Sequence, residues 1–532
     1  HLAGACDVEK GDRVATLAMN STDMLEVHAA CAKLGAIFFP LNWRLAPPEL
    51  DYIVNDGAPK VLIHDDETQP LLAGMTATIP HQIRTNGMGG ASVYEDVIAA
   101  SDGDHPKPDV DLDDTWLILY TSGTTGKPKG AMISHGNLMY SVSAGLRDAP
   151  VFDTDDQLCF LPLCHILERV FSVNAPIAAA STINFAESPE TIFDNLQEVS
   201  PQTFVAVPRL WEKIYSQVAL RVGDASGMQK WAYAQALKAG GARAEYLAEG
   251  KPVPIGTSLT YRFWDVALLQ NLRRMIGMDR LRRGGSGAAP ISPDLLRWYQ
   301  SIGVPVLEGY GMTESSGVIS FNSDSNNKIG TVGPALPGAQ IRVATDGEVQ
   351  YKAGNVFQGY WKNPDKTAET FTEDGWLRTG DVGIVDNQGF LTITGRLKDI
   401  IITAGGKNIT PAEIENKLKF SPYIADVVVI GDKRKFLTCL VMIDQENVEK
   451  FAQDRRVPFS NYASLCAATE VQELIRVTVD NVNKDFARVE QIKDFRLINV
   501  LLTADDDELT PTMKLKRSFV ETKHGELISQ MY

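Results

Sequence analysis

A loop rich in glycine and hydroxyl groups is the first part of the sequence that could do chemistry. The segment YTSGTTGKPKG, residues 120–130, combines glycines that allow close approach, hydroxyl donors and two lysines, a combination suited to phosphate oxygens. A Walker A loop has four residues between its first glycine and its Gly-Lys pair. Here only two residues separate Gly123 from Gly126, and Pro128 follows Lys127. The spacing excludes the standard P-loop and leaves a phosphate-binding loop of another kind as the prediction.

Composition limits which ligands and compartments are plausible. The chain has 532 residues, above the roughly 250–300 at which one core stops growing, so we expect at least two domains. The formal charge of −16 disfavours electrostatic binding of nucleic acid over a wide surface. Anionic ligands must therefore be bound by local lysine, arginine or backbone N–H groups. Six scattered cysteines without CxxC pairs predict reduced thiols in a cytoplasmic protein. We predict no transmembrane span, leave peripheral membrane contact open, and expect that an N-terminal piece is missing.

The elements that must position the loop alternate along the chain. Between residues 13 and 66, short apolar runs alternate with amphipathic stretches, the pattern of an α/β sheet with both faces covered. Glycine or proline loops follow the apolar runs TWLILY, TFVAVP and PVLEGY and the run RLRR, so we expect them to converge on one crevice. We predict an α/β fold: a large N-terminal domain of layered sheets with a β-rich subdomain (1–397), and a small mobile α+β domain (398–532).

Five motifs in order give the chain a family resemblance. The loop is similar to the phosphate loop of the AMP-forming adenylating superfamily, which includes acyl-CoA synthetases, peptide-synthetase adenylation domains and firefly luciferase. The other motifs are GYGMTE (309–314), WLRTGD (376–381), GRLKDIIITAGGKNITPAEIE (395–415) and TPTMKLKR (510–517). The resemblance runs from about Lys10 to the end. It implies that ATP activates a carboxylate as acyl-AMP, with release of pyrophosphate, before the acyl group passes to a thiol.

The resemblance also implies roles for single residues. Tyr310 would stack on adenine opposite the wall at 286–290, Asp381 would hold the ribose hydroxyls, and Arg396 would lie beside ribose and phosphate. Glu314, with Thr124, would ligate Mg²⁺, which suits a hard cation. The full set of implied ATP contacts is Thr121, Ser122, Gly123, Thr124, Thr125, Gly126, Lys127, Lys129, Gly287, Ala288, Ala289, Pro290, Gly309, Tyr310, Gly311, Met312, Thr313, Asp381, Arg396 and Lys514.

The C-terminal motifs imply a moving domain. Lys514 matches the lysine that reaches the carboxylate and the α-phosphate during adenylation, although Lys516 and Arg517 compete for that assignment. Lys398 matches the hinge about which the domain swings. Gly405 and Gly406 would then line the passage for the pantetheine of coenzyme A, or they form a simple β-turn.

Two segments bear on which acid is used. LPLCHILER (161–169) and VPRLWEKIY (207–215) resemble long-chain fatty acyl-CoA synthetases, whereas LNWRLAPPEL (41–50) looks more like medium-chain and aryl ligases. His165 lines the acyl or adenylate site, or it is a packed core histidine. Trp211 gates the fatty-acid tunnel, or it is a core aromatic. The expected activity is a long-chain fatty acid:CoA ligase using ATP, Mg²⁺ and coenzyme A. Alternatives are another acid, an acyl carrier protein as acceptor, a non-catalytic acyl-binding relative, or an ATPase that produces ADP; the oligomeric state stays open.

Overall fold

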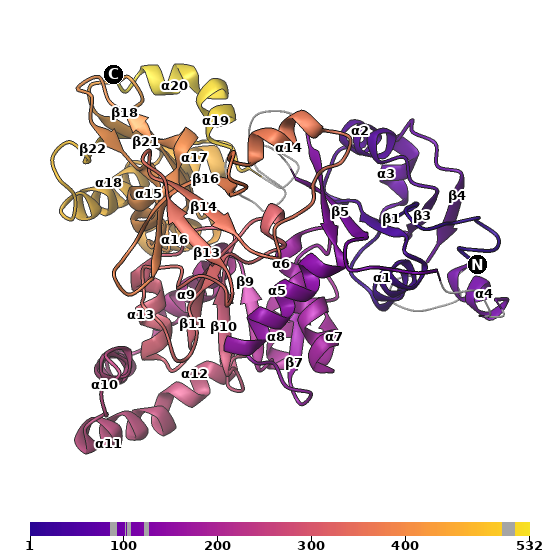
Figure 1. Cartoon of the computed structure of the whole chain (residues 1–532). Coiled ribbons are helices and arrows are strands. Elements are labelled where there is room, and N and C mark those ends of the chain that lie inside the picture. Colours follow the sequence, from indigo (N-terminus) through magenta and orange to yellow (C-terminus); the bar gives the residue numbers. More distant parts are fainter. Residues whose placement is uncertain (86–92, 102, 104–107, 122–126, 503–515) are drawn as a thin grey trace.

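The computed structural model describes residues 1–85, 93–101, 103, 108–121, 127–502 and 516–532 (Figure 1). Six of the predicted site residues lie outside this part of the chain: Ser122, Gly123, Thr124, Thr125, Gly126 and Lys514.

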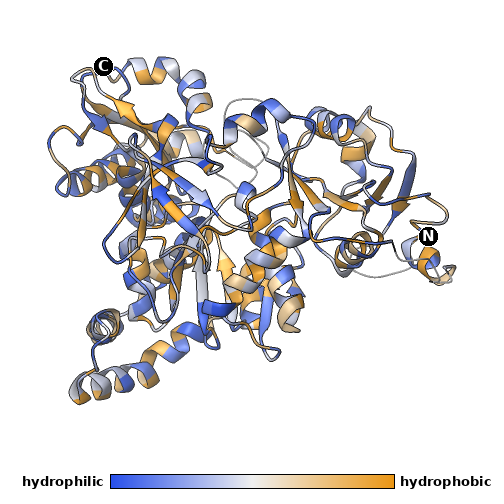
Figure 2. Cartoon of the chain, in the orientation of Figure 1, coloured by the Kyte–Doolittle hydropathy of each residue, from blue (hydrophilic) through white to orange (hydrophobic). Residues whose placement is uncertain are grey.

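A seven-stranded sheet forms the N-terminal part, in the order β15-β6-β5-β2-β1-β3-β4. Strands β1 to β5 run parallel, and β6 and β15 close one edge antiparallel. Phe38 and Phe39 are both fully buried on opposite faces, as predicted for a sheet covered on both sides. Figure 2 shows the central strands as largely apolar and the edge strand β4 as hydrophilic. The strands are β1 Arg13–Leu17, β2 Ile37–Pro40, β3 Val61–His64, β4 His81–Arg84, β5 Thr115–Thr121, β6 Lys129–Ser134 and β15 Gly359–Tyr360, and the helices are α1 Thr22–Leu34, α2 Pro47–Gly57, α3 Gln69–Gly74 and α4 Val93–Ala99.

A second sheet lies beside the first, in the order β12-β11-β10-β9, with β9, β10 and β11 parallel. Its strands are β9 Thr203–Ala206, β10 Arg283–Ser286, β11 Val306–Tyr310 and β12 Ser320–Phe321, and α9 Pro208–Asp224 and α13 Pro293–Ser301 belong to the same layer. A two-stranded unit packs nearby: β7 Asp156–Cys159 and β8 Thr182–Phe185, with α5 His135–Asp148, α6 Ile166–Arg169, the π-helix η1 Val170–Asn174, α7 Ala175–Ala179 and α8 Ile192–Val199.

The strand β10 corrects one sequence prediction. The run RLRR was expected to be the strand and the following glycines its loop, but the strand begins at Arg283 and includes Gly284 and Gly285. A Cβ on Gly284 would lie 3.0 Å from the Trp211 ring, and one on Gly285 would lie 2.9 Å from Val205. These two strand positions are glycine because neighbouring side chains occupy the space that a Cβ would need.

The stretch predicted to be mostly helical projects from the body (Figure 1). It consists of α10 Gly227–Ala248, α11 Ile255–Trp264, the π-helix η2 Asp265–Leu269 and α12 Gln270–Met275. Within the described ranges, no helix is long and apolar enough to cross a membrane.

The remainder contains the β-rich part and the C-terminal domain. An antiparallel sheet has the order β13-β14-β16-β17, and it leads through the short helix η4 Leu397–Asp399 into an α+β unit with its own core. The elements are η3 Thr313–Ser315, β13 Gln340–Val343, β14 Glu348–Lys352, α14 Pro364–Thr370, β16 Leu377–Val385, β17 Leu391–Arg396, β18 Ile401–Ile402, β19 Asn408–Ile409, α15 Pro411–Lys419, β20 Ile424–Ile430, β21 Leu437–Ile443, α16 Gln445–Arg455, α17 Tyr462–Ala467, α18 Thr469–Asn483, β22 Ile492–Leu497, α19 Arg517–Lys523 and α20 Gly525–Ser529. All six cysteines are buried free thiols.

Candidate active site

A cavity of about 840 Å³ opens where the predicted loops meet. Its lining includes Thr121 at the end of β5, Val207 after β9, Gly287 after β10 and Gly311 after β11. These are the carboxyl ends of strands, where open α/β sheets bind ligands. The volume lies at the upper end of the roughly 300–1,000 Å³ typical of ligand pockets, so the cavity has room for more than a nucleotide base.

The two candidate lysines of the phosphate loop lie in different places. Lys129, the first residue of β6, lines the cavity, and its Nζ is 4.1 Å from the centre of the Tyr360 ring. Lys127 is exposed and does not line the cavity; its Nζ lies 4.9 Å from the centre of the Tyr52 ring. The structure therefore favours Lys129 as the cation that meets phosphate.

Glu314 is a buried acid that lines the cavity near Tyr360. It lies in η3, lines the cavity, and its Oε1 accepts a 2.5 Å hydrogen bond from the Tyr360 hydroxyl. Among the described residues, no group of three or more acidic, His or Cys side chains could hold a metal. A Mg²⁺ ion commonly uses one or two carboxylates together with substrate phosphates, so a single carboxylate here fits the predicted ion.

Tyr310, Asp381 and Arg396 form one connected set. The Tyr310 hydroxyl donates a 2.6 Å hydrogen bond to Oδ2 of Asp381, and Arg396 Nε lies 3.2 Å from Oδ1 of the same carboxylate. The pairing of β16 with β17 places Asp381 opposite Arg396. Burial raises the pKa of Tyr310 well above its usual range, so the hydroxyl keeps its proton and remains a donor. The three residues that the resemblance assigned to the nucleoside are thus in contact.

The loops after β10 and β11 are shaped by backbone constraints. Ala288 has a φ of +65°, a left-handed conformation that is uncommon for a residue with a Cβ and is often found at functional sites. A Cβ on Gly311 would lie 2.0 Å from the Gly317 carbonyl oxygen, so only glycine fits there. The predicted residues that line the cavity from these loops are Gly287, Ala288, Gly309, Tyr310, Gly311, Met312 and Thr313, whereas Ala289 and Pro290 do not line it.

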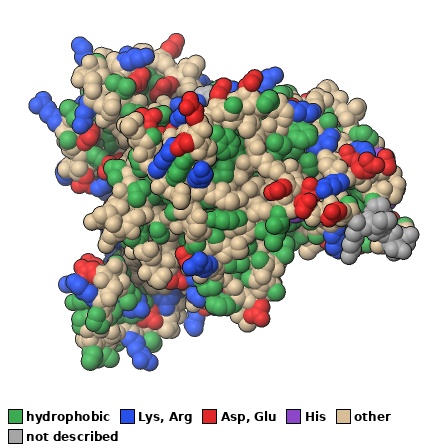
Figure 3. All heavy atoms as spheres, in the orientation of Figure 1, with side chains coloured by type: hydrophobic (Ala, Val, Ile, Leu, Met, Phe, Trp, Pro, Cys, Tyr) green, Lys and Arg blue, Asp and Glu red, His purple; other side chains and the backbone are tan. Residues whose placement is uncertain are grey.

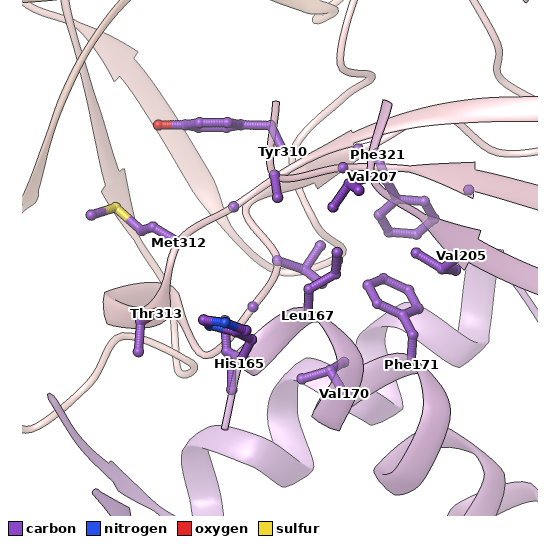
Figure 4. Close-up of a pocket in the computed structure, with 18 of the residues that line it drawn as sticks. His165, Leu167, Val170, Phe171, Val205, Val207, Tyr310, Met312, Thr313 and Phe321 are labelled. Atoms are coloured by element: carbon purple, nitrogen blue, oxygen red, sulfur yellow. The ribbon is translucent and has the colours of Figure 1, made fainter. Parts of the chain in front are cut away.

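His165 reaches the cavity as a neutral imidazole. Its Nε2 is buried without a hydrogen-bond partner, and burial together with the charge of Arg44 lowers its pKa to about 4. An unpartnered nitrogen beside a cavity is available to a ligand. In Figure 4, His165 lies between Met312 and Tyr310 on one side and the apolar side chains on the other.

Two further residues of the same motif, Glu168 and Arg169, are both buried and do not line the cavity. Glu168 accepts a 2.8 Å hydrogen bond from the Phe160 amide, and burial raises its pKa to about 7. Arg169 donates to the Leu163 carbonyl oxygen, at 3.0 Å from Nε and 2.6 Å from Nη2. Both side chains hold the motif's loop in shape.

An apolar branch extends from the polar end of the cavity. In Figure 4, Phe171, Val205 and Phe321 face one another in this branch. Its apolar lining comes from α5, η1, β9 and β12 and includes Val142, Leu146, Val170, Phe171, Val205 and Phe321. A hydrocarbon chain is the natural ligand for such a surface.

Trp211 lies behind this branch and does not line it. Its indole N–H donates a 3.1 Å hydrogen bond to the Gly285 carbonyl oxygen, and its ring is in edge contact with Phe204 and Tyr299. The side chain is fully buried. In this conformation Trp211 packs in the core, and a gating role would require it to move.

Tyr360 and Glu308 are among the cavity residues that were not expected from the sequence. Tyr360 contacts Glu314 from β15, and nothing in its local sequence indicates that contact. Glu308 lines the cavity from β11, and burial raises its pKa to about 8 even though it accepts a 2.9 Å hydrogen bond from the Gly330 amide. An acid within an apolar strand, directly before GYGMTE, was the signal that could have revealed Glu308.

The C-terminal candidates are divided among three positions. Lys398, in η4, lines the cavity. Gly405 and Gly406 form the exposed turn between β18 and β19, away from the cavity lining, and Gly406 has a φ of +76°. Arg517 Nη2 lies 2.5 Å from Oε1 of Glu415, and its Nη1 donates to the Val429 carbonyl oxygen at 2.6 Å. Arg517 is thereby held within the C-terminal domain, which weakens its competition with Lys514.

The fold and the cavity define a nucleotide-dependent enzyme of the adenylate-forming class. Residues 1–361 match the AMP-binding enzyme family, and residues 398–532 match the C-terminal domain of AMP-binding enzymes. The chain belongs to this family. It is an AMP-forming acid–thiol ligase, a class of enzyme that uses ATP with Mg²⁺ and takes coenzyme A as cosubstrate.

Individual relatives make the comparison more specific. The chain is 32% identical to the long-chain-fatty-acid–CoA ligase FadD15 of Mycobacterium bovis, over 99% of this chain and 88% of that protein. It is 28% identical to the peroxisomal long chain acyl-CoA synthetase 7 of Arabidopsis thaliana, over 99% of this chain and 78% of that protein. The crystal structure of ATP-bound MatB from Rhodopseudomonas palustris is similar with a TM-score of 0.70 and 25% identity, covering 99% of this chain and 91% of that one.

Proposed function

We propose that this protein is a long-chain fatty acid:CoA ligase. The observation that carries the proposal is that one cavity joins the polar cluster around Glu314 to an apolar branch lined from α5, η1 and β9. A substrate with a carboxylate head and a hydrocarbon tail matches that division, because each part meets surface of its own polarity. The relatives named as long-chain ligases support the same substrate class.

In the first half-reaction, a carboxylate oxygen of the fatty acid attacks the α-phosphorus of ATP, and the bond to pyrophosphate breaks. Lys129 meets the negative charge on the departing phosphates, as does Lys514 at the α-phosphate. Tyr310 flanks adenine, Asp381 accepts hydrogen bonds from the ribose hydroxyls, and Arg396 orients that carboxylate through its 3.2 Å contact. Mg²⁺ held by Glu314, with Thr124, would supply further charge neutralisation at the phosphates.

His165 lies at the junction of the two parts of the cavity. Because its imidazole is neutral, its free Nε2 can hydrogen-bond the acyl carboxylate or the adenylate without an added charge. In this role His165 orients the substrate, and Trp211 gates the branch if its ring leaves the core packing.

In the second half-reaction, the thiol of coenzyme A attacks the acyl carbonyl and AMP leaves. We propose that the domain from residue 398 onward rotates about Lys398, which removes Lys514 and brings Gly405 and Gly406 to the thiol's path. Gly405 and Gly406, both exposed, have no side chain that would obstruct a narrow cosubstrate.

The alternative functions, which use another acid or another acyl acceptor, lead to different predictions. A medium-chain or aryl ligase would favour short or ring-containing acids, a carrier-protein ligase would require that protein in place of coenzyme A, and an ATPase would release ADP. The test is AMP release with coenzyme A, across straight-chain acids from acetate to stearate and with benzoate. We expect AMP and pyrophosphate as products and the highest kcat/KM with the longest chains. A maximum at a short or aryl acid, or ADP as the product, would overturn the proposal.

A further inference from the structure

The projecting helices carry an apolar stripe that faces solvent. Along α11 and the start of η2, Ile255, Leu259, Phe263 and Val266 recur at spacings of four, four and three residues, which places them on one helical face. Their exposures are 81, 63, 62 and 61%. Arg262, also exposed, lies at the edge of the same face.

The neighbouring helix extends this surface. Met228 and Trp231, near the start of α10, are also exposed. The Trp231 ring is in edge contact with the Trp264 ring of α11, with 5.9 Å between the ring centres. In Figure 3, green hydrophobic and blue basic side chains share the surface of these helices at the lower left. Phe263 is in edge contact with Trp264, so ring contacts connect the stripe to Trp231 of α10. Scattered apolar residues on a surface are ordinary, but an apolar helical face of this kind marks an interaction site.

The stripe is exposed although the helices that carry it are firmly attached. A Cβ on Gly240 of α10 would lie 1.7 Å from the Ser301 carbonyl oxygen, so α10 rests directly against α13. Trp298 Nε1 donates a 2.7 Å hydrogen bond to the Tyr233 hydroxyl across the same contact. On α11, the Tyr261 ring packs against Arg243 of α10, whose Cζ lies 4.6 Å from the ring centre. The inner faces of both helices are therefore used in packing, and the stripe is on the outer face of α11.

The net charge of the projecting helices indicates which kind of partner binds them. Residues 227–275 contain seven basic and three acidic residues, a formal charge of +4, within a chain whose formal charge is −16. The apolar stripe thus lies on a basic segment of an acidic protein. Apolar side chains, aromatic rings and flanking cations are the features with which an amphipathic helix enters the interface of an anionic bilayer.

We infer that α10 and α11 form a membrane-docking surface, which lies flat on an anionic lipid bilayer with Ile255, Leu259, Phe263 and Val266 inserted among the acyl chains. The inference goes beyond the proposed ligase activity. A bilayer is also where a water-insoluble fatty acid is concentrated, so membrane docking and ligase activity are compatible. They are nevertheless separate properties.

The test is cosedimentation of the purified protein with vesicles of phosphatidylcholine and phosphatidylglycerol in equal parts, without ATP or acid. We expect the wild-type protein to bind these vesicles, and to bind pure phosphatidylcholine and high-salt samples less. Leu259→Asp with Phe263→Asp should lower the partition coefficient at least about tenfold. Lys238 is an exposed cation on α10, two turns beyond Trp231, and Lys238→Glu with Arg262→Glu should lower the partition coefficient by a similar factor. Ile384→Asp, an equally exposed apolar position on β16, is the control and should bind as the wild type does.

Three results would overturn the inference. These are a wild-type protein that stays in the supernatant, a Leu259→Asp/Phe263→Asp variant that binds as tightly as the wild type, and a wild-type dimer that becomes monomeric in that variant by sedimentation velocity. The last result would assign the stripe to a second copy of the chain. Unchanged thermal unfolding of the variants confirms that they are folded, and because the assay uses no ligase substrates, its outcome is independent of the proposed activity.

Discussion

The hydroxyl of Tyr310 donates a 2.6 Å hydrogen bond to Asp381, which lies 71 residues further along the chain. This contact predicts separable effects on ATP binding. Tyr310→Phe keeps the ring and loses one hydrogen bond, whose net value is about 0.5–1.5 kcal/mol, so the KM for ATP should rise by about tenfold or less with little change in kcat. Asp381→Asn should raise the KM for ATP further, because it weakens both the contact with Arg396 and the acceptor for the ribose hydroxyls. A larger effect of Tyr310→Phe than of Asp381→Asn would contradict this assignment.

Tyr360 should tune the magnesium requirement through Glu314. Tyr360→Phe removes the 2.5 Å hydrogen bond that orients the carboxylate, and losing such a supporting contact typically costs about 10- to 100-fold in metal affinity. We expect the Mg²⁺ concentration for half-maximal AMP release to rise by about tenfold. Tyr351→Phe is the matched control, because the Tyr351 hydroxyl bonds to Asn355 in the core, 2.9 Å away and off the cavity. Equal magnesium curves for the two variants would argue against Glu314 as the ligand.

The two lysines of the phosphate loop should differ in importance. Lys129→Met removes the phosphate-loop lysine that lines the cavity, and acid-dependent ATP–pyrophosphate exchange should fall by about 100-fold. Lys127→Met changes an exposed side chain beside Tyr52, and the same exchange rate should change by less than about threefold. The reverse order would mean that Lys127 turns toward the nucleotide when ATP binds.

Glu308 should make stability depend on pH. Burial raises its pKa to about 8 in the folded protein, whereas the unfolded carboxyl titrates near its ordinary value of 4.5. Folding therefore favours the protonated form, and stability falls as pH rises from about 4.5 to about 8. Glu308→Gln cannot ionise, so it should melt at least about 2 °C above the wild type at pH 9 and close to it at pH 5.

The matched control for Glu308 is Glu348→Gln, which alters a buried acid that pairs with Arg378 at 3.1 Å. This variant loses an ion pair and should melt below the wild type at pH 9. Thermal unfolding across pH 5–9 measures both variants, and a Glu308→Gln protein less stable than the wild type at pH 9 would refute the prediction.

Lys398 should matter more for the second half-reaction than for the first. Proline at this position restricts the backbone where the domain is proposed to turn, so Lys398→Pro should slow thioester formation from supplied acyl-AMP by about tenfold more than it slows adenylation. Lys398→Ala, which leaves the backbone free, should change the two rates by similar factors. Equal losses in both steps for Lys398→Pro would argue against a hinge at this residue.

Local patterns predicted much of the fold. The alternation of apolar strands and amphipathic helices near the N-terminus indicated a covered α/β sheet, and the burial of Phe38 and Phe39 on opposite faces agrees with it. The strand β10 was misplaced because its extent depends on backbone pairing with β9 and β11, which are distant in the sequence. Trp211 and Val205 occupy the space beside Gly284 and Gly285, which explains why these strand positions are glycine.

The sequence by itself determined the kinds of chemical group at the site and their order along the chain, because motifs such as GYGMTE keep residues of set types at set spacings. Only the tertiary structure decided that Lys129 and not Lys127 lines the cavity, that Tyr360 holds Glu314, and that Glu308 titrates near pH 8. The reason is physical. Distance, burial and local charge depend on side chains brought together from segments far apart in the chain, and no local pattern encodes them.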